Sequence, residues 1–278
     1  DIMPRTSGEA EQLIEQMMIT ANIAAAKFSL DHKLPFLYRV NGTPDPKRGE
    51  ELVTLLKLVK IPCRELEKPE PQTQDFAAVL DRASGLPCET LVSQRLLRTM
   101  EKARYSTEET GHFGLALEHY SHFTSPIRRY PDTSIHRILS AFTEGVPAEE
   151  IRRRYGQFAE VSARESSQNE IRALMAERDA EDCYMAEYMR QHIGEHYDGV
   201  VSGVTQRGVF VRLENSVEGF VSLDGFTSES FVYDGLITHR SPKRELTIGT
   251  PLPIIVASAY VATGKVDFMP DLEKEAQA

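Results

Sequence analysis

The stretch Asp198-Gly-Val-Val-Ser-Gly-Val-Thr-Gln-Arg-Gly-Val-Phe-Val-Arg-Leu213 decides the fold of the last third of the chain. Its apolar residues recur at every second position on both sides of Thr205-Gln-Arg-Gly208, a pattern typical of two strands joined by a turn. The segments 218–223, 251–261 and 265–269 have the same texture. Five short strands within roughly 75 residues predict a small antiparallel barrel of the OB kind.

Alternation along these strands also predicts which barrel side chains meet solvent, because successive residues of a strand point to opposite faces. The inward set is Val209, Val211, Leu213, Val221 and Leu223, and the outward set is Phe210, Arg212 and Phe220. Two exposed aromatic rings beside a cation make a platform on which nucleic-acid bases stack. The alternative is that the phenylalanines pack against a neighbouring domain.

Upstream of residue 194 the apolar residues recur at three- and four-residue steps, which predicts helices. Thr6 and Glu9 have the capping-box spacing at the start of the first one. We expect helices over 8–30, 47–59, 74–83 and 89–100, one beginning at Ser125-Pro126, and a charged one over 148–192 with a break near 165–168. Residues 35–40 and 111–120 are expected to be extended. The change of period places the domain boundary at 194–197.

Composition bounds the class of protein. The chain has 278 residues, 41% of them hydrophobic and 27% charged, and it contains neither a membrane-length apolar run nor a signal-peptide pattern. Three widely spaced cysteines indicate reduced thiols and a cytoplasmic protein. The net charge of −10 argues against a nucleic-acid partner, yet residues 121–140 hold three arginines against one aspartate, a local balance of +2.

The basic segment contains the most informative motif, which runs from Gly111 to Asp132. Thr124 and Ser125 offer hydroxyls and backbone amides at an expected helix start, and helix starts favour anions. Arg128 and Arg129 follow within the expected first turn, so that hydroxyls and guanidinium groups together could clamp a phosphate. The alternative is an ordinary capped helix with solvated arginines. His112, His119, His122 and His136 lie nearby, but no metal-ligand spacing stands out, and we interpret them as structural.

The segment His122-Phe-Thr-Ser-Pro-Ile-Arg-Arg-Tyr-Pro-Asp132, followed by His136-Arg137, closely resembles the signature of the ribonuclease II/R family. Further matches are Gly111-His-Phe-Gly-Leu115, Pro35-Phe-Leu-Tyr-Arg-Val40 with Pro44-Asp-Pro46, and Leu13-Ile-Glu15 through Ala21-Asn22. Residues 197–269 resemble an S1 domain, through Gly199 to Val204, Gly208 to Leu213, Val217 to Val221 and Val266-Asp-Phe268. These matches lie in order along the chain.

The resemblance implies processive 3′-to-5′ hydrolysis of single-stranded RNA to nucleoside 5′-monophosphates, with Mg²⁺ held by an aspartate cluster. Arg128 would be the catalytic residue that stabilises charge on the phosphate near the scissile bond. Thr124, Ser125, Arg129 and Tyr130 would contact the RNA. Glu177 matches a glutamate near the catalytic end of the family's RNA channel, although Glu177 to Asp182 also has the spacing of a solvated helix face.

The aspartate cluster is expected upstream of this sequence, together with the front half of the catalytic domain, so no metal ligand is assigned here. The fold class is therefore predicted as α+β: residues 1–194 as the helix-rich C-terminal half of an RNB-type catalytic domain, 195–270 as an antiparallel five-stranded S1 barrel, and 271–278 as a polar tail. The expected partners are single-stranded RNA and the missing N-terminal half, with no membrane. Alone, the chain is expected to be inactive. The alternative is a non-catalytic RNA-binding protein derived from the family.

Overall fold

The computed structural model of the protein describes residues 8–86, 88–226, 229–234 and 237–275. Contacts divide the chain into two compact units. One holds the described residues up to Ser84 together with Ser93–Ala173, and the other holds Gly85–Val92 and the chain from Leu174 onward. The predicted domain limits at 194–197 stay a prediction.

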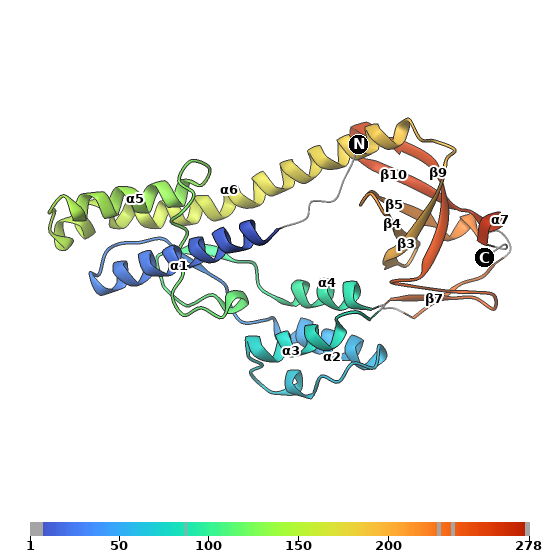
Figure 1. Ribbon diagram of the computed structural model, residues 1–278, viewed down its shortest axis with the longest axis horizontal. Helices are drawn as coiled ribbons and strands as arrows, with labels where there is room; N and C mark the ends of the chain where they lie inside the picture. Colours follow the sequence, from blue (N-terminus) through green and yellow to red (C-terminus); the bar gives the residue numbers. More distant parts are fainter. Residues whose placement is uncertain (1–7, 87, 227–228, 235–236, 276–278) are drawn as a thin grey trace. The chain divides into compact units, whose positions relative to one another are not determined.

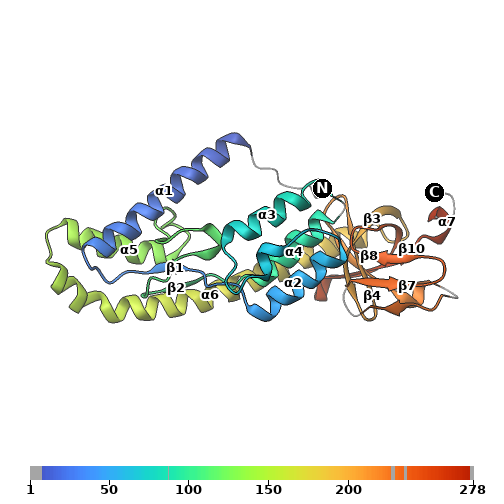
Figure 2. The same cartoon turned by 90° about the horizontal axis from the view of Figure 1, so that it is seen from below.

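The helical unit contains the predicted helices of the front part (Figure 1). Its elements are α1 (Glu9–Asp31), β1 (Tyr38–Val40), α2 (Pro46–Leu58), η1 (Arg64–Glu67), α3 (Thr73–Ala83), most of α4 (Glu89–Thr99), β2 (Arg104–Ser106), η2 (Phe113–Leu115), α5 (Tyr130–Thr143) and the first part of α6 (Ala148–Arg190). Figure 2 shows α2, α3 and α4 grouped together, and η1 contacts both α2 and α3. The predicted capping box depends on Thr6, which lies outside the described residues. Glu11 instead accepts a hydrogen bond from the amide of Gly8, the residue before α1.

The core of this unit forms where α1, β1, α5 and α6 meet. Ala26, Ile135, Ile138 and Ile151 are fully buried there, and Phe36 joins them from the segment before β1. The small residues Ala159 and Ala163 let α6 approach this core closely. The free energy gained by burying this apolar surface is the main contribution that holds residues 32–37, the segment after α1, against the core.

The helix α6 is continuous, so the predicted break near 165–168 is wrong. Ser167 lies inside the helix, where its hydroxyl donates to the carbonyl of Ala163 at 2.8 Å and accepts the backbone N–H of Tyr105 at 2.9 Å. These bonds satisfy the polar side chain within the helix, so its presence does not end the helix.

The predicted barrel is present, but it is mixed and not purely antiparallel. Its strands are β3 (His196–Thr205), β4 (Gly208–Leu213), β5 (Glu218–Ser222), β9 (Pro251–Tyr260) and β10 (Lys265–Pro270), closed in the order β10-β5-β4-β3-β9. Four neighbouring pairs are antiparallel, whereas β10 and β5 run parallel. Alternation along a strand indicates which side chains face inward, but it carries no information on the direction of a partner strand such as β10, where Asp267 pairs with Phe220 of β5, 47 positions earlier.

Four of the five residues predicted to face inward are in the barrel core, with Val209, Val211 and Val221 fully buried and Leu213 nearly so. Leu223 is only partly buried, because β5 ends at Ser222 and Leu223 begins the short helical segment that follows. The last turns of α6 add Ala186 and Met189 to the barrel core. Between β5 and β9 the chain forms a three-stranded sheet that the sequence did not predict, made of β6 (Val232–Tyr233), β7 (Thr238–Arg240) and β8 (Glu245–Thr247). The buried His239 bonds through Nε2 to the carbonyl of Thr205, which ties β7 to the end of β3. Short helical segments η3 (Leu223–Gly225), η4 (Val261–Thr263) and α7 (Leu272–Glu275) complete the unit.

Candidate functional site

The predicted phosphate clamp lies on a loop that precedes α5. The helix begins at Tyr130 and not at Ser125, so the expectation that Arg128 and Arg129 occupy its first turn is wrong. The reason is Pro131: a helix that started at Ser125 would carry this proline in its interior, where it lacks the N–H for the ladder. Starting at Tyr130 puts Pro131 in the first turn, where no N–H is needed.

Five hydrogen bonds fix the loop. The Ser125 carbonyl accepts the amides of Arg128 and Arg129 at 3.3 and 3.1 Å. The Thr133 hydroxyl donates to the carbonyl of Pro126 at 2.7 Å. Oδ1 of Asp132 accepts both the Ser125 amide and the Arg129 guanidinium, each at 2.8 Å. The Ser125 amide is therefore occupied within the fold.

The loop presents Arg128 at its surface. Ile127 and Arg128 are exposed, and within the described part of the chain the Arg128 guanidinium has no hydrogen bond or ion pair. By contrast, Arg129 is half-buried and paired with the fully buried Asp132. Buried Thr124 Oγ1 also has no partner among the described residues. A free cation and an unsatisfied hydroxyl on one short loop suit an anionic ligand.

The aromatic rings of Tyr105, Tyr120 and His122 pack together next to the loop, which His122 precedes by two residues. The hydroxyl of Tyr105 and Nδ1 of His122 are 2.8 Å apart, and the His122 ring meets those of Tyr105 and Tyr120 edge-on. Burial, with the positive charges of Arg129 and Arg39, lowers the pKa of His122 to about 3. Burial likewise lowers the pKa of His112 to about 4 and raises that of Tyr105 to about 12. The rings of His112 and His122 and the hydroxyl of Tyr105 are therefore uncharged at neutral pH.

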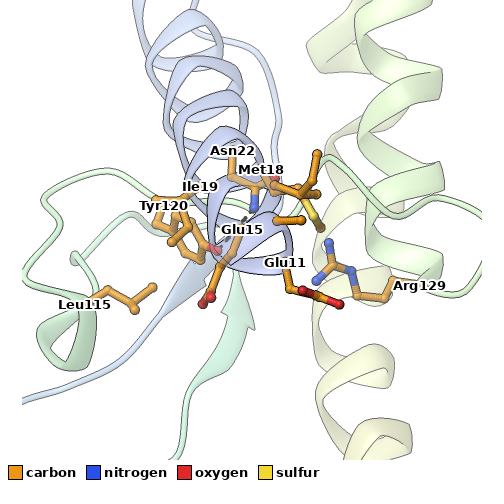
Figure 3. Close-up of a pocket in the computed structure, with 10 residues that line it drawn as sticks. Glu11, Glu15, Met18, Ile19, Asn22, Leu115, Tyr120 and Arg129 are labelled. Carbon is orange, nitrogen blue, oxygen red and sulfur yellow. Dashed lines mark hydrogen bonds between the residues drawn. The ribbon is translucent and has the colours of Figure 1, made fainter. Parts of the chain in front are cut away.

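A pocket of about 490 Å³ opens between α1 and the segment that carries Leu115, Tyr120 and Arg129. Figure 3 shows Glu11 and Arg129 on one side of it, Leu115 and Tyr120 on the other, and Asn22 bonded to the Tyr120 hydroxyl at 3.2 Å. Asn22 also accepts the amide of Phe123, so it joins α1 to the loop segment. The α1 contribution to the pocket is Ala10, Glu11, Ile14, Glu15, Met18, Ile19 and Asn22.

The sequence did not identify this pocket, although the residues at its α1 side recur every three or four positions. The same spacing predicts a helix with one apolar face. The structure shows that only the second half of α1 reaches the core, while Leu13, Ile14 and Met17 stay more than half exposed.

The outward face of the barrel has the predicted composition. Phe210 and Phe220 are opposite each other on β4 and β5, with ring centroids 5.3 Å apart. Phe210 is exposed and Phe220 half-buried. Arg212 lies beside them on β4, and its Nη2 is 3.2 Å from Oε2 of Glu218 on β5. The sequence did not predict this ion pair.

Glu177 lies in an exposed stretch of α6 that covers residues 171–182. Its carboxylate has no hydrogen bond or ion pair within the described part of the chain, and Glu177 belongs to the same compact unit as the barrel. Among the residues that the structure describes, no group of three His, Cys, Asp or Glu side chains could hold a metal ion. The described residues therefore do not fit the metal cluster that the resemblance implies.

The geometry defines a class of protein: a helical unit with a cationic loop beside a pocket, and an OB-type barrel with an aromatic outer face. Comparison with known proteins agrees with this. Residues 1–145 match the RNB domain and residues 190–268 match the S1 RNA binding domain. Ribonuclease R 1 of Lactococcus lactis is 38% identical over 273 residues, which cover 96% of this chain and 33% of that protein. Ribonuclease R of Aquifex aeolicus is 40% identical over 237 residues, which cover 84% of this chain and 33% of that protein.

A solved structure shows the same likeness. Mycoplasma genitalium RNase R in complex with ribose methylated single-stranded RNA matches with a TM-score of 0.84 and 28% identity, over 96% of this chain and 42% of that one. The chain belongs to the ribonuclease II/R family. It spans about a third of the length of the curated relatives it matches. In the described residues, no helix is both long and apolar enough to cross a membrane.

Proposed function

We propose that this chain is part of an exoribonuclease that digests single-stranded RNA processively from the 3′ end and releases nucleoside 5′-monophosphates. The observation that carries the proposal is the exposed Arg128, which has no partner among the described residues, on a loop fixed by the ion pair of Arg129 with the buried Asp132. The ribonuclease R relatives and the RNA-bound structure of one of them support it.

In this proposal Arg128 contacts the phosphate near the scissile bond and stabilises charge that develops on it. The Thr124 hydroxyl, which lacks a partner in the described fold, is the second donor. Ser125 contributes through its hydroxyl, because its amide is bonded to Asp132. Arg129, whose charge is paired with Asp132, contacts the RNA where it lines the pocket beside the loop. Tyr130, which is 57% exposed, flanks the loop.

The pocket beside Arg129 suits the nucleotide that follows this phosphate. Its apolar lining, from Ile14, Met18 and Leu115, offers contacts for a base. The carboxylates of Glu11 and Glu15 can accept hydrogen bonds from ribose hydroxyls. One of these, the 2′-hydroxyl, is absent from DNA. The pocket would then favour RNA over DNA.

The barrel holds incoming RNA through Phe210, Arg212 and Phe220, and Glu177 contacts RNA from α6. Mg²⁺ serves the complete enzyme, with its ligands in the part of the relatives' length that this chain does not span. The front half of the catalytic domain is thus a partner of this chain, and the chain alone binds RNA without cutting it. A cytoplasmic location stays a prediction.

The test uses this chain and a 5′-labelled single-stranded RNA, with and without Mg²⁺. A native gel measures binding and a denaturing gel measures cutting. We expect binding without shortening, weakened by Arg128→Ala but not by Arg153→Ala, which removes an equal charge from an exposed site on α6. Equal binding by both variants would contradict the role of Arg128. A Mg²⁺-dependent ladder would show that the metal ligands lie within this chain.

If the complete protein, front half included, binds RNA and leaves it intact with Mg²⁺, the non-catalytic alternative holds. In that case the loop and the barrel serve binding only. The same two gels, run on the complete protein, therefore separate a nuclease from a binding protein.

A further inference from the structure

Asp132 has an unusual position for a carboxylate. Its side chain is fully buried in the first turn of α5, and all of its hydrogen bonds go to the loop that carries Arg128. A buried charge is costly unless it is paired and hydrogen-bonded. Here Arg129 supplies the opposite charge and Ser125 supplies a backbone N–H, both to the single oxygen Oδ1.

The two bonds act at the two ends of the loop. The Ser125 amide marks the start of the turn, and Arg129 is the residue directly before α5. One carboxylate oxygen thus pins both ends, and the residues between them are exposed, Arg128 included. A loop that is fixed in the free protein loses less conformational entropy when it binds a ligand.

The ion pair with Asp132 makes the two arginines of the loop differ in charge balance and exposure. Arg129 is half-buried, and its charge is balanced by Asp132 at 2.8 Å. Arg128 keeps an unbalanced charge at the surface. Removal of Asp132 would free the loop ends and leave Arg129 to compete with Arg128 for the same anion.

We propose that Asp132 is the positioning residue for Arg128: it holds the 125–129 loop closed so that the Arg128 guanidinium is preorganised to receive an RNA phosphate. The inference rests on the proposed function for the identity of the ligand. The closure of the loop by Asp132, however, can be tested without RNA.

The first experiment is a double-mutant cycle on the full chain, with the affinity for a single-stranded RNA as the readout. Asp132→Asn removes the charge but keeps a carbonyl oxygen near Ser125, so it should weaken binding less than Asp132→Ala, for which we expect a roughly 10-fold loss. In the Arg128→Ala background, the loss from Asp132→Ala should shrink to less than about 2-fold, because residues that act through one another are not additive. A merely structural role would give the same loss in both backgrounds and would overturn the proposal.

The second experiment measures amide hydrogen exchange of residues 123–131. In Asp132→Asn we expect faster exchange at Ser125 and Arg129, with unchanged protection in the later turns of α5. Ser134→Ala is the matched control, because Ser134 is also buried in the first turns of α5 but bonds only to the carbonyl of Tyr130. This control should change neither the exchange of the loop nor the coupling to Arg128.

The outcomes separate the two proposals. If Arg128→Ala leaves RNA binding unchanged while Asp132→Asn loosens the loop, the proposed function fails and the positioning of the loop stands. If Asp132→Asn leaves the exchange of the loop unchanged, the positioning role is overturned whatever the RNA does. Should Asp132→Ala fail to fold, Asp132→Asn takes its place in the cycle with the same criterion.

Discussion

Phe210 and Phe220 face each other across β4 and β5, with their ring centroids 5.3 Å apart and both on the outer side of the barrel. Two rings at this spacing offer contiguous apolar area to unpaired bases. Each replacement by alanine is expected to cost about 1–3 kcal/mol of binding to single-stranded RNA, or roughly 5- to 150-fold in Kd. Fluorescence anisotropy with a labelled RNA measures this.

Tyr184→Ala is the control for that prediction, because Tyr184 is an exposed aromatic residue of α6. Substitutions at exposed sites usually have small effects, so Tyr184→Ala should change the Kd for single-stranded RNA by less than about twofold. Unchanged affinity in both phenylalanine variants would show that the outer face of the barrel does not bind RNA.

Two glycines of the barrel give a matched test of packing. A Cβ at Gly208 would lie 2.6 Å from Cζ of Phe220 and closer still to the carbonyl of Val221. A Cβ at Gly203 would meet only Phe210, at an ordinary 3.5 Å. We therefore expect Gly208→Ala to lower the free energy of unfolding by about 1–3 kcal/mol, and Gly203→Ala to leave it nearly unchanged. Thermal unfolding by circular dichroism compares them, and equal melting temperatures would contradict this account.

Ser167 connects the middle of α6 to the strand β2. Its hydroxyl accepts the Tyr105 amide at 2.9 Å, so Ser167→Ala leaves that N–H without its partner. We expect a loss of about 1–3 kcal/mol in the free energy of unfolding. Ser166→Ala, at a half-buried neighbour with no bond of this kind, should cost less than half as much. Chemical denaturation measures the free energy of unfolding of both variants. The prediction is wrong if the two losses are equal.

The half-buried His122 predicts how stability depends on pH. Its pKa falls to about 3 in the folded chain, against the ordinary value of about 6.5 in the unfolded chain. The unfolded state therefore binds the extra proton between these values, and stability that is complete above pH 6.5 is lost as the pH falls toward 3, at up to ~1.4 kcal/mol per pH unit. His112, with a pKa of about 4, acts in the same direction.

His122→Gln removes one of these titrating groups. Urea denaturation between pH 7 and pH 4.5 should then show a shallower decline in the free energy of unfolding than the unmodified chain shows. His119→Gln is the control, since His119 is partly exposed and paired with Glu109. Parallel declines in all three proteins would exclude His122 as a source of the pH dependence.

Local patterns predicted most of the elements. The helix over 8–30 is observed at Glu9–Asp31, and the strand over 209–213 at Gly208–Leu213. Helical and strand periods are properties of a short window of sequence, so they can be recognised without knowledge of the partner. The start of α5 was missed by five residues because Ser125-Pro126 is itself a good helix start, and only Pro131 decides against it.

The candidate site was predicted in part. The motif predicted that Thr124, Ser125, Arg128 and Arg129 lie close together, but at a helix start and not on the loop where they are observed. Alternation correctly predicted that Phe210 and Phe220 share one face. The different states of the two arginines were not predictable, because they depend on which guanidinium reaches the buried Asp132. The pocket joins α1 to residues about 100 positions later, and its existence depends on that packing.

The sequence by itself determined the family, most of the helices, the strands of the barrel, and most of its inward and outward positions, because each follows from a motif or a period along the chain. Only the tertiary structure decided the parallel pairing of β5 with β10, the ion pair of Arg39 with Glu170 across 131 positions, and the closure of the Arg128 loop by Asp132. These depend on which surfaces meet when the cores form, and burial and hydrogen-bond satisfaction select that arrangement from many that the local patterns allow.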